Sequence, residues 1–112
     1  MLAEKVAQLL NTQINKEFYS AYFYLDFANY YENEGLKGFA NWYEIQAQEE
    51  RDHAMLFRKY LLNNGHQVTF TEIDSPHKEY QSFLDPLKLG LEHEQYVTGL
   101  IHEIYDEAYQ AK

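Results

Sequence analysis

Residues that interrupt helices are scarce in this chain: its 112 residues include two prolines and five glycines. Between them, three long stretches place apolar residues at alternating spacings of three and four, which gathers the side chains on one face of a helix. The pattern predicts helices over about residues 4–32 and 39–63, and a third helix from Asp85 to the end of the chain. Residues 33–38 are predicted to form a short turn, and Gly65 marks the end of the second helix.

The segment between the second and third predicted helices, about residues 65–84, has no helical period and is too long for a tight turn. Roughly twenty extended residues reach roughly 65 Å, whereas a helix of about 25 residues is roughly 38 Å long. The segment can therefore cross the whole molecule, which would place the third helix parallel to the second. Asp85 followed by Pro86 is typical of a helix N-cap and first turn.

The chain is therefore predicted to be one all-α domain over residues 1–112, an antiparallel helix bundle with a long crossover between the second and third helices. Three helices of this length leave an apolar face without a cover. We expect either further chain or a partner chain to complete the bundle.

Charge and composition exclude several classes of protein. The chain has 18 acidic residues, 9 basic residues and no cysteine, so it is neither a disulfide-stapled scaffold nor a thiolate-metal protein. Nucleic-acid binding is not expected, because Arg51, Arg58 and Lys59 form the only basic group. No stretch approaches the roughly 20 apolar residues of a membrane span, and the N-terminus lacks the apolar centre of a signal peptide. A cytoplasmic protein is the expectation.

Two of the predicted helices carry ionisable side chains on their apolar faces. Glu17 lies in the middle of the first apolar stripe. Glu50 and His53 interrupt the second stripe, and their spacing of three residues places both side chains on one face. An ionised carboxylate that faces a core is costly unless it is paired. Glu-x-x-His on such a face has the spacing of metal ligands in helix bundles.

On the third predicted helix Glu94 is the candidate ligand, although Glu92 and His93 adjoin it and periodicity does not select among the three. Carboxylates and an imidazole that converge from several helices suit divalent iron or manganese, and one bridging carboxylate can hold two metal ions. A site for a single metal ion fits the same residues. Each residue also has an ordinary alternative: a lone glutamate can extend to water, Glu49 can be a solvated charge, and Tyr24 can be a core aromatic.

The residues around these positions resemble those of bacterial non-haem ferritins. The similarity runs through Asn11–Leu25, Gln46–Ala54 and Leu91–Gln95, and it extends over the whole chain. The resemblance implies a ferritin-like four-helix bundle with a short fifth helix. It also implies that many subunits form a hollow cage that stores ferric oxyhydroxide.

The same resemblance implies a di-iron ferroxidase centre between the helices. Glu17, Glu50 and His53 would bind one iron. Glu94 would bind the second iron, and Glu50 would bridge the two.

Two further positions match the family. Tyr24 corresponds to a tyrosine beside the centre, and Glu49 corresponds to a contributor to a nearby third iron site. The chain resembles a ferritin without its fourth and fifth helices, and the fourth helix supplies further ligands in the family. The implied function is a self-associating iron-storage subunit that oxidises Fe(II) to Fe(III) with dioxygen. The alternative is a truncated helical assembly module with weak or no metal binding and no ferroxidase activity.

Overall fold

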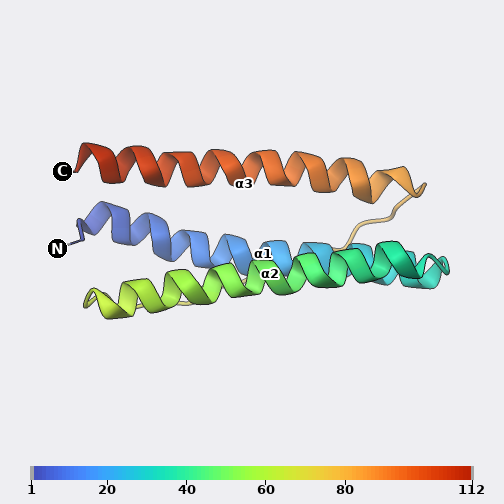
Figure 1. Cartoon of the computed structure of the whole chain (residues 1–112), viewed down its shortest axis with the longest axis horizontal. Coiled ribbons are helices and arrows are strands. Elements are labelled where there is room, and N and C mark those ends of the chain that lie inside the picture. Colours follow the sequence, from blue (N-terminus) through green and yellow to red (C-terminus); the bar gives the residue numbers. More distant parts are fainter. Residues whose placement is uncertain (1, 112) are drawn as a thin grey trace.

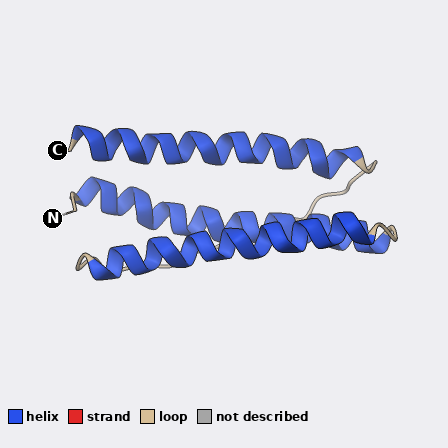
Figure 2. Ribbon diagram, viewed as in Figure 1, coloured by secondary structure: helices blue, strands red, loops and turns tan. Residues whose placement is uncertain are grey.

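Three long helices make up the computed structural model, which describes residues 2–111 (Figure 1). They are α1 (Glu4–Asn33), α2 (Lys37–Asn63) and α3 (Leu84–Gln110). The described residues form helices and loops without strands, which confirms the all-α prediction (Figure 2). The predicted helix boundaries differ from the observed ones by two residues at most, apart from the end of α3, where the prediction ran to the end of the chain.

Glycines in the left-handed region end the first two helices. Gly35 has φ +76°, and the backbone N–H of Leu36 donates to the carbonyl of Tyr31 at 2.9 Å. Gly65 has φ +78° and ends α2 in the same way, as predicted. A residue with a Cβ atom would be strained at either position. The predicted turn was too long at its far end, because the chain is already helical at Lys37 once Gly35 has reversed its direction.

The crossover between α2 and α3 runs along α1 and is fixed to it by side chains of α1. Asn11 pairs with Thr69 through two hydrogen bonds of 2.9 Å, with its amide donating to the carbonyl and its oxygen accepting from the N–H. Farther along, the hydroxyl of Tyr80 donates to Asp26 Oδ2 at 2.6 Å. The crossover therefore spans the length of the molecule, and α3 runs parallel to α2 (Figure 1). Both features were predicted from segment length.

The prediction that Asp85 is the N-cap of the third helix was wrong. The helix begins one residue earlier, at Leu84, and Asp85 lies in its first turn. There Asp85 Oδ2 accepts a hydrogen bond from the backbone N–H of Gln81 at 2.7 Å. The carboxylate thus binds the chain that precedes the helix instead of an N–H of the helix itself, so it fastens the end of the crossover to α3.

The core of the molecule lies between α1 and α2. Aromatic side chains fill one end of this interface, where Phe27 and Tyr31 are completely buried. Aliphatic side chains fill the other end, around Ile14 and Leu61. These two helices bury one continuous set of side chains against each other, so their packing fixes the faces on which any functional residue can lie.

The third helix is packed differently. It lies along α1 and not along α2, and its buried residues within the described part of the chain are Pro86 and Gly90 (Figure 1). Large apolar side chains such as Leu91, 63% exposed, and Tyr105, 68% exposed, have no cover. The predicted open face is therefore present. No helix within residues 2–111 combines the length and the apolar character that crossing a membrane requires.

Candidate metal centre

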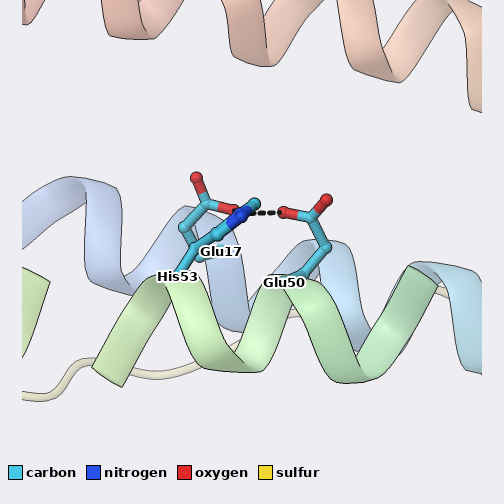
Figure 3. Close-up of side chains that lie close together, drawn as sticks. All are labelled: Glu17, Glu50 and His53. Atoms are coloured by element: carbon cyan, nitrogen blue, oxygen red, sulfur yellow. Dashed lines mark ion pairs between the residues drawn. The ribbon is translucent and has the colours of Figure 1, made fainter. Parts of the chain in front are cut away.

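Glu17 of α1 and Glu50 and His53 of α2 point toward one another at the middle of the helix pair (Figure 3). Each offers one ligand atom, and these atoms all lie within 4.8 Å of one another. The spacing of three residues on α2 brings Glu50 and His53 to the same face, and packing against α1 brings Glu17 to the same level. The three side chains that interrupted the apolar stripes thus meet in space.

Glu17 is the most deeply buried member, with 2% of its surface exposed. Its Oε1 accepts a hydrogen bond from the amide of Gln13 at 3.0 Å. Its Oε2 is buried and has no hydrogen-bond partner among the described residues. A buried carboxylate oxygen without a partner is costly, because it has lost water and gained nothing in exchange. A cation at this point would remove that cost.

Glu50 is 6% exposed and faces the same difficulty. The pKa of its carboxyl is raised to about 9, first by burial, then by the hydrogen bond to Glu17 and its charge, and last by the charges of Glu94 and Glu49. The cluster of acidic groups therefore favours the protonated form of Glu50 when no cation is bound. A divalent cation would take the place of that proton.

His53 completes the group at its open side. Its Nδ1 lies 3.4 Å from Glu50 Oε2 and 3.8 Å from Glu17 Oε2 (Figure 3). The sequence predicted a core-facing imidazole, but 51% of the side chain is exposed. The reason is the uncovered face of the bundle, where the backbone of α3 does not approach α2. The imidazole therefore stands at the boundary between the buried carboxylates and solvent.

Glu94 is close to the group of Glu17, Glu50 and His53 but is not a member of it. It accepts a short hydrogen bond from the hydroxyl of Tyr24, which is buried on α1. Burial raises the pKa of Tyr24 well above its usual value, and the hydrogen bond to Glu94 raises it further, so the phenol keeps its proton. Glu92 and Glu94 are both exposed, but the carboxylate of Glu94 contacts Tyr24 of α1, and His93 contacts Ser20. Glu94 therefore stays the candidate ligand of α3.

Glu49 does not join the group. Its side chain is exposed, and its described influence on the centre is through its charge, which contributes to the raised pKa of Glu50. Conversely, the sequence reasoning missed the role of Gln13. Its amide lies four residues before Glu17 in the sequence and donates to the buried carboxylate. That spacing was the available signal.

The donor set suits a divalent cation of intermediate hardness. Two carboxylates and one imidazole are ligands that iron, manganese and zinc accept together. The buried Oε2 of Glu17, which has no hydrogen-bond partner among the described residues, and the raised pKa of Glu50 both indicate that the folded chain gathers negative charge here for a cation to balance. The residues therefore fit Fe(II), and they do not by themselves distinguish iron from manganese.

Comparison with known proteins gives one consistent result. Residues 7–112 match the family described as a ferritin-like domain. The whole chain is 37% identical to a bacterial non-heme ferritin of Staphylococcus saprophyticus and covers 67% of that protein. It is 33% identical to a probable bacterial non-heme ferritin-like protein of Haemophilus influenzae, of which it covers 68%.

Solved structures agree with the sequence relatives. An open-pore ferritin from the archaeon Archaeoglobus fulgidus superposes with a TM-score of 0.95 at 41% identity, over 99% of this chain and 68% of that one. A ferritin of Chlorobium tepidum superposes with a TM-score of 0.94 at 28% identity, over the same shares. The chain thus spans about two thirds of each of these relatives.

Proposed function

Because this chain belongs to the ferritin-like domain family, we propose that it binds Fe(II) at Glu17, Glu50 and His53 and oxidises it to Fe(III) with dioxygen. Residues 1–112 would act as one ferritin-like unit of an iron-storage protein. The observation that carries the proposal is the buried Oε2 of Glu17, a carboxylate oxygen in the middle of a helix pair without a hydrogen-bond partner among the described residues.

Each residue would have a distinct part in this reaction. Glu17 and His53 would be terminal ligands of one iron, and Glu50 would bridge to a second iron that Glu94 also binds. Fe(II) is the substrate and gives its electron to dioxygen. Glu50 would release its proton when the cation enters, because its raised pKa keeps it protonated otherwise.

Tyr24 and Glu49 would act around the di-iron position. Tyr24 holds Glu94 through its hydroxyl and would be a hydrogen-bond or electron donor to the centre. Glu49, exposed beside Glu50, would bind iron that enters or leaves. We further propose a cytoplasmic protein that self-associates into a cage or another homo-oligomer, because relatives with the same fold are named ferritins.

The test is the rate of Fe(II) oxidation in air after Glu50→Ala. We expect the rapid phase of Fe(III) formation, followed by absorbance after mixing, to slow on the order of tenfold or more, since the shared ligand is lost. Glu44→Ala is the matched control, because Glu44 lies on the same helix and is exposed. Unchanged kinetics in Glu50→Ala would refute the assignment.

The second candidate is an assembly module without ferroxidase activity. The observation in its favour is the half-exposed imidazole of His53, which leaves the group open to water on one side. Crystals soaked in Fe(II) distinguish the two functions. Anomalous peaks beside Glu17 and Glu50 support the ferroxidase, and their absence supports the module.

A further inference from the structure

His93 is the neighbour of the proposed ligand Glu94, yet it has a separate and well-defined environment on α1. Its ring stacks on Phe23 with 4.7 Å between ring centroids and an interplanar angle of 28°. Tyr19 lies on another side, with its ring centroid 5.9 Å away. The imidazole is half-buried, whereas most side chains of α3 are exposed.

A buried hydroxyl completes this environment and lies within hydrogen-bond distance of the imidazole ring. Ser20 Oγ lies 2.6 Å from Nε2 of His93 and is itself completely buried. The same hydroxyl donates to the carbonyl of Lys16 at 2.9 Å. A serine hydroxyl has one hydrogen, so once it donates to Lys16 it can only accept from His93. With the serine hydrogen on the carbonyl of Lys16, the tautomer of His93 that fits is the one that carries its hydrogen on Nε2 and donates it to Ser20.

The hydrogen bond between Ser20 and His93 lies beside the hydrogen bond between Tyr24 and Glu94. Ser20 and Tyr24 are four residues apart, one turn of α1, and they bind His93 and Glu94, which are consecutive on α3. Consecutive side chains on a helix point about 100° apart. Two such side chains held at two heights on α1 determine both the rotation of α3 about its axis and its position along α1.

The apolar contacts of α3 lie toward its two ends, where Leu87 and Leu89 pack against the aromatic part of the core and Ile104 packs against the aliphatic part. The buried residues of α3 within the described range are Pro86 and Gly90, near the start of the helix. Farther along, Lys5 and Glu107 form an exposed ion pair of 3.8 Å, which contributes little because solvent screens it. The two hydrogen bonds at residues 93 and 94 are the polar contacts nearest to Glu94, so they bear most directly on its direction.

We propose that His93, through its hydrogen bond to Ser20, is a positioning residue that turns Glu94 toward Glu50 and so creates the second metal position. The inference rests on the proposed function and adds a residue to it. Partners that orient metal ligands in this way typically change metal affinity 10–100-fold when they are removed. His93 is not one of the described residues whose ligand atoms lie within 4.8 Å of one another.

The test is a titration of the metal-free chain with Co(II), followed by calorimetry and by the visible absorption of the bound ion. Unmodified protein should show a tighter event at Glu17, Glu50 and His53 and a weaker event that Glu94→Gln removes. His93→Phe keeps a stacked ring and loses the donor. We expect it to weaken the second event at least tenfold and leave the first unchanged.

Two further variants separate positioning from a general structural role. Ser20→Ala removes the acceptor and should reproduce the effect of His93→Phe. His93→Gln places an amide N–H where Nε2 was and should restore most of the second affinity. Glu92→Gln is the matched control on the exposed side of α3 and should change neither event. Circular dichroism checks that each variant keeps its helical content, and the His93→Phe and His93→Gln pair suffices if Ser20→Ala does not fold.

The outcomes distinguish the two proposals. If Glu94→Gln weakens the second event and both His93 variants match the unmodified protein, the positioning role is overturned and the metal centre stands. Equal loss in His93→Phe and His93→Gln also overturns it, because the donor then does not matter. If the unmodified protein binds no Co(II), the proposed function fails and the positioning role fails with it.

Discussion

The pair α1–α2 buries far more of its side chains than the helix α3 does. The pair buries side chains along its whole length, with Phe27, Tyr31 and Leu61 completely inaccessible. The third helix is as long as α2, yet among the described residues it buries Pro86 and Gly90. Burial of apolar surface is the main stabilising contribution in folding, so nearly all of the packing energy of this chain resides in the pair.

The candidate metal centre is divided along the same line. The pair holds Glu17, Glu50 and His53 in place with its own core, so this part of the site is organised before any metal arrives. The third helix would contribute Glu94 to the proposed second position, and the carboxylate of Glu94 accepts a hydrogen bond from Tyr24 of α1. One metal position therefore rests on rigid packing, and the proposed second position rests on a helix that a few contacts orient.

The largest expected effect tests whether stability really resides in the pair. Phe27→Ala removes a completely buried ring that contacts Phe23, Tyr24 and Tyr43. We expect a loss of about 3–5 kcal/mol in the free energy of unfolding, because the substitution leaves a cavity in the core. Urea denaturation followed by circular dichroism measures it.

The matched change on the third helix is Tyr105→Ala, which removes an aromatic side chain that is 68% exposed. It should alter stability by no more than about 0.5 kcal/mol, the range of most surface substitutions. Similar losses in the two variants would mean that α3 contributes to the core as much as the pair does, and the comparison would then be wrong.

The next prediction concerns how far the buried carboxyl of Glu50 lowers the stability of the metal-free chain. Glu50→Gln replaces a carboxyl with an uncharged amide of the same size. We expect it to stabilise the metal-free chain by about 2 kcal/mol at pH 8, because folding at that pH requires Glu50 to take up a proton that the unfolded chain has released. The same variant should lose metal affinity. The free energy of unfolding, measured from pH 5 to pH 9, checks the first expectation.

The direction with pH follows from the raised pKa of Glu50. Its carboxyl has a pKa of about 9 in the folded chain, against 4.5 for an unperturbed glutamate. Between these values the folded chain holds a proton that the unfolded chain has released, so stability falls as the pH rises. Glu50→Gln should remove this slope, whereas Glu94→Gln, at an exposed position, should retain it. A slope that persists without Glu50 would contradict the assignment.

The smallest effect compares two glycines within α3. Gly99→Ala adds a methyl group in open space, since no atom lies within 4 Å of the new Cβ. We expect a gain of up to about 1 kcal/mol, the difference in helix propensity. At Gly90 the same Cβ would lie 3.3 Å from the hydroxyl of Tyr43 and 3.5 Å from Phe27.

The crowding at Gly90 should cancel the gain that alanine brings at Gly99. Urea denaturation of the two variants, side by side, gives the difference. Equal stabilisation would show that α3 does not approach the pair closely at Gly90, and the second metal position would then lack its nearest packed contact.

The sequence predicted the three helices and the crossover because these depend on local spacing and on segment length. It also predicted which carboxylates were out of place, since Glu17 and Glu50 interrupt apolar stripes that local period defines. It could not choose among Glu92, His93 and Glu94, because three consecutive residues cover most of the circumference of a helix. Nor could it foresee that His53 is half-exposed, which depends on the distance between α2 and α3.

What the sequence by itself determined is the set of helices, their apolar faces and the residues that could bind a metal. A period of 3.6 residues specifies neighbours along one helix, whatever surrounds it. Only the tertiary structure decided that Glu17 Oε2 is left without a partner, that Tyr24 binds Glu94 and that Ser20 accepts from His93. These contacts join residues far apart in the chain, so they follow from how one helix is rotated against another, which no local pattern specifies.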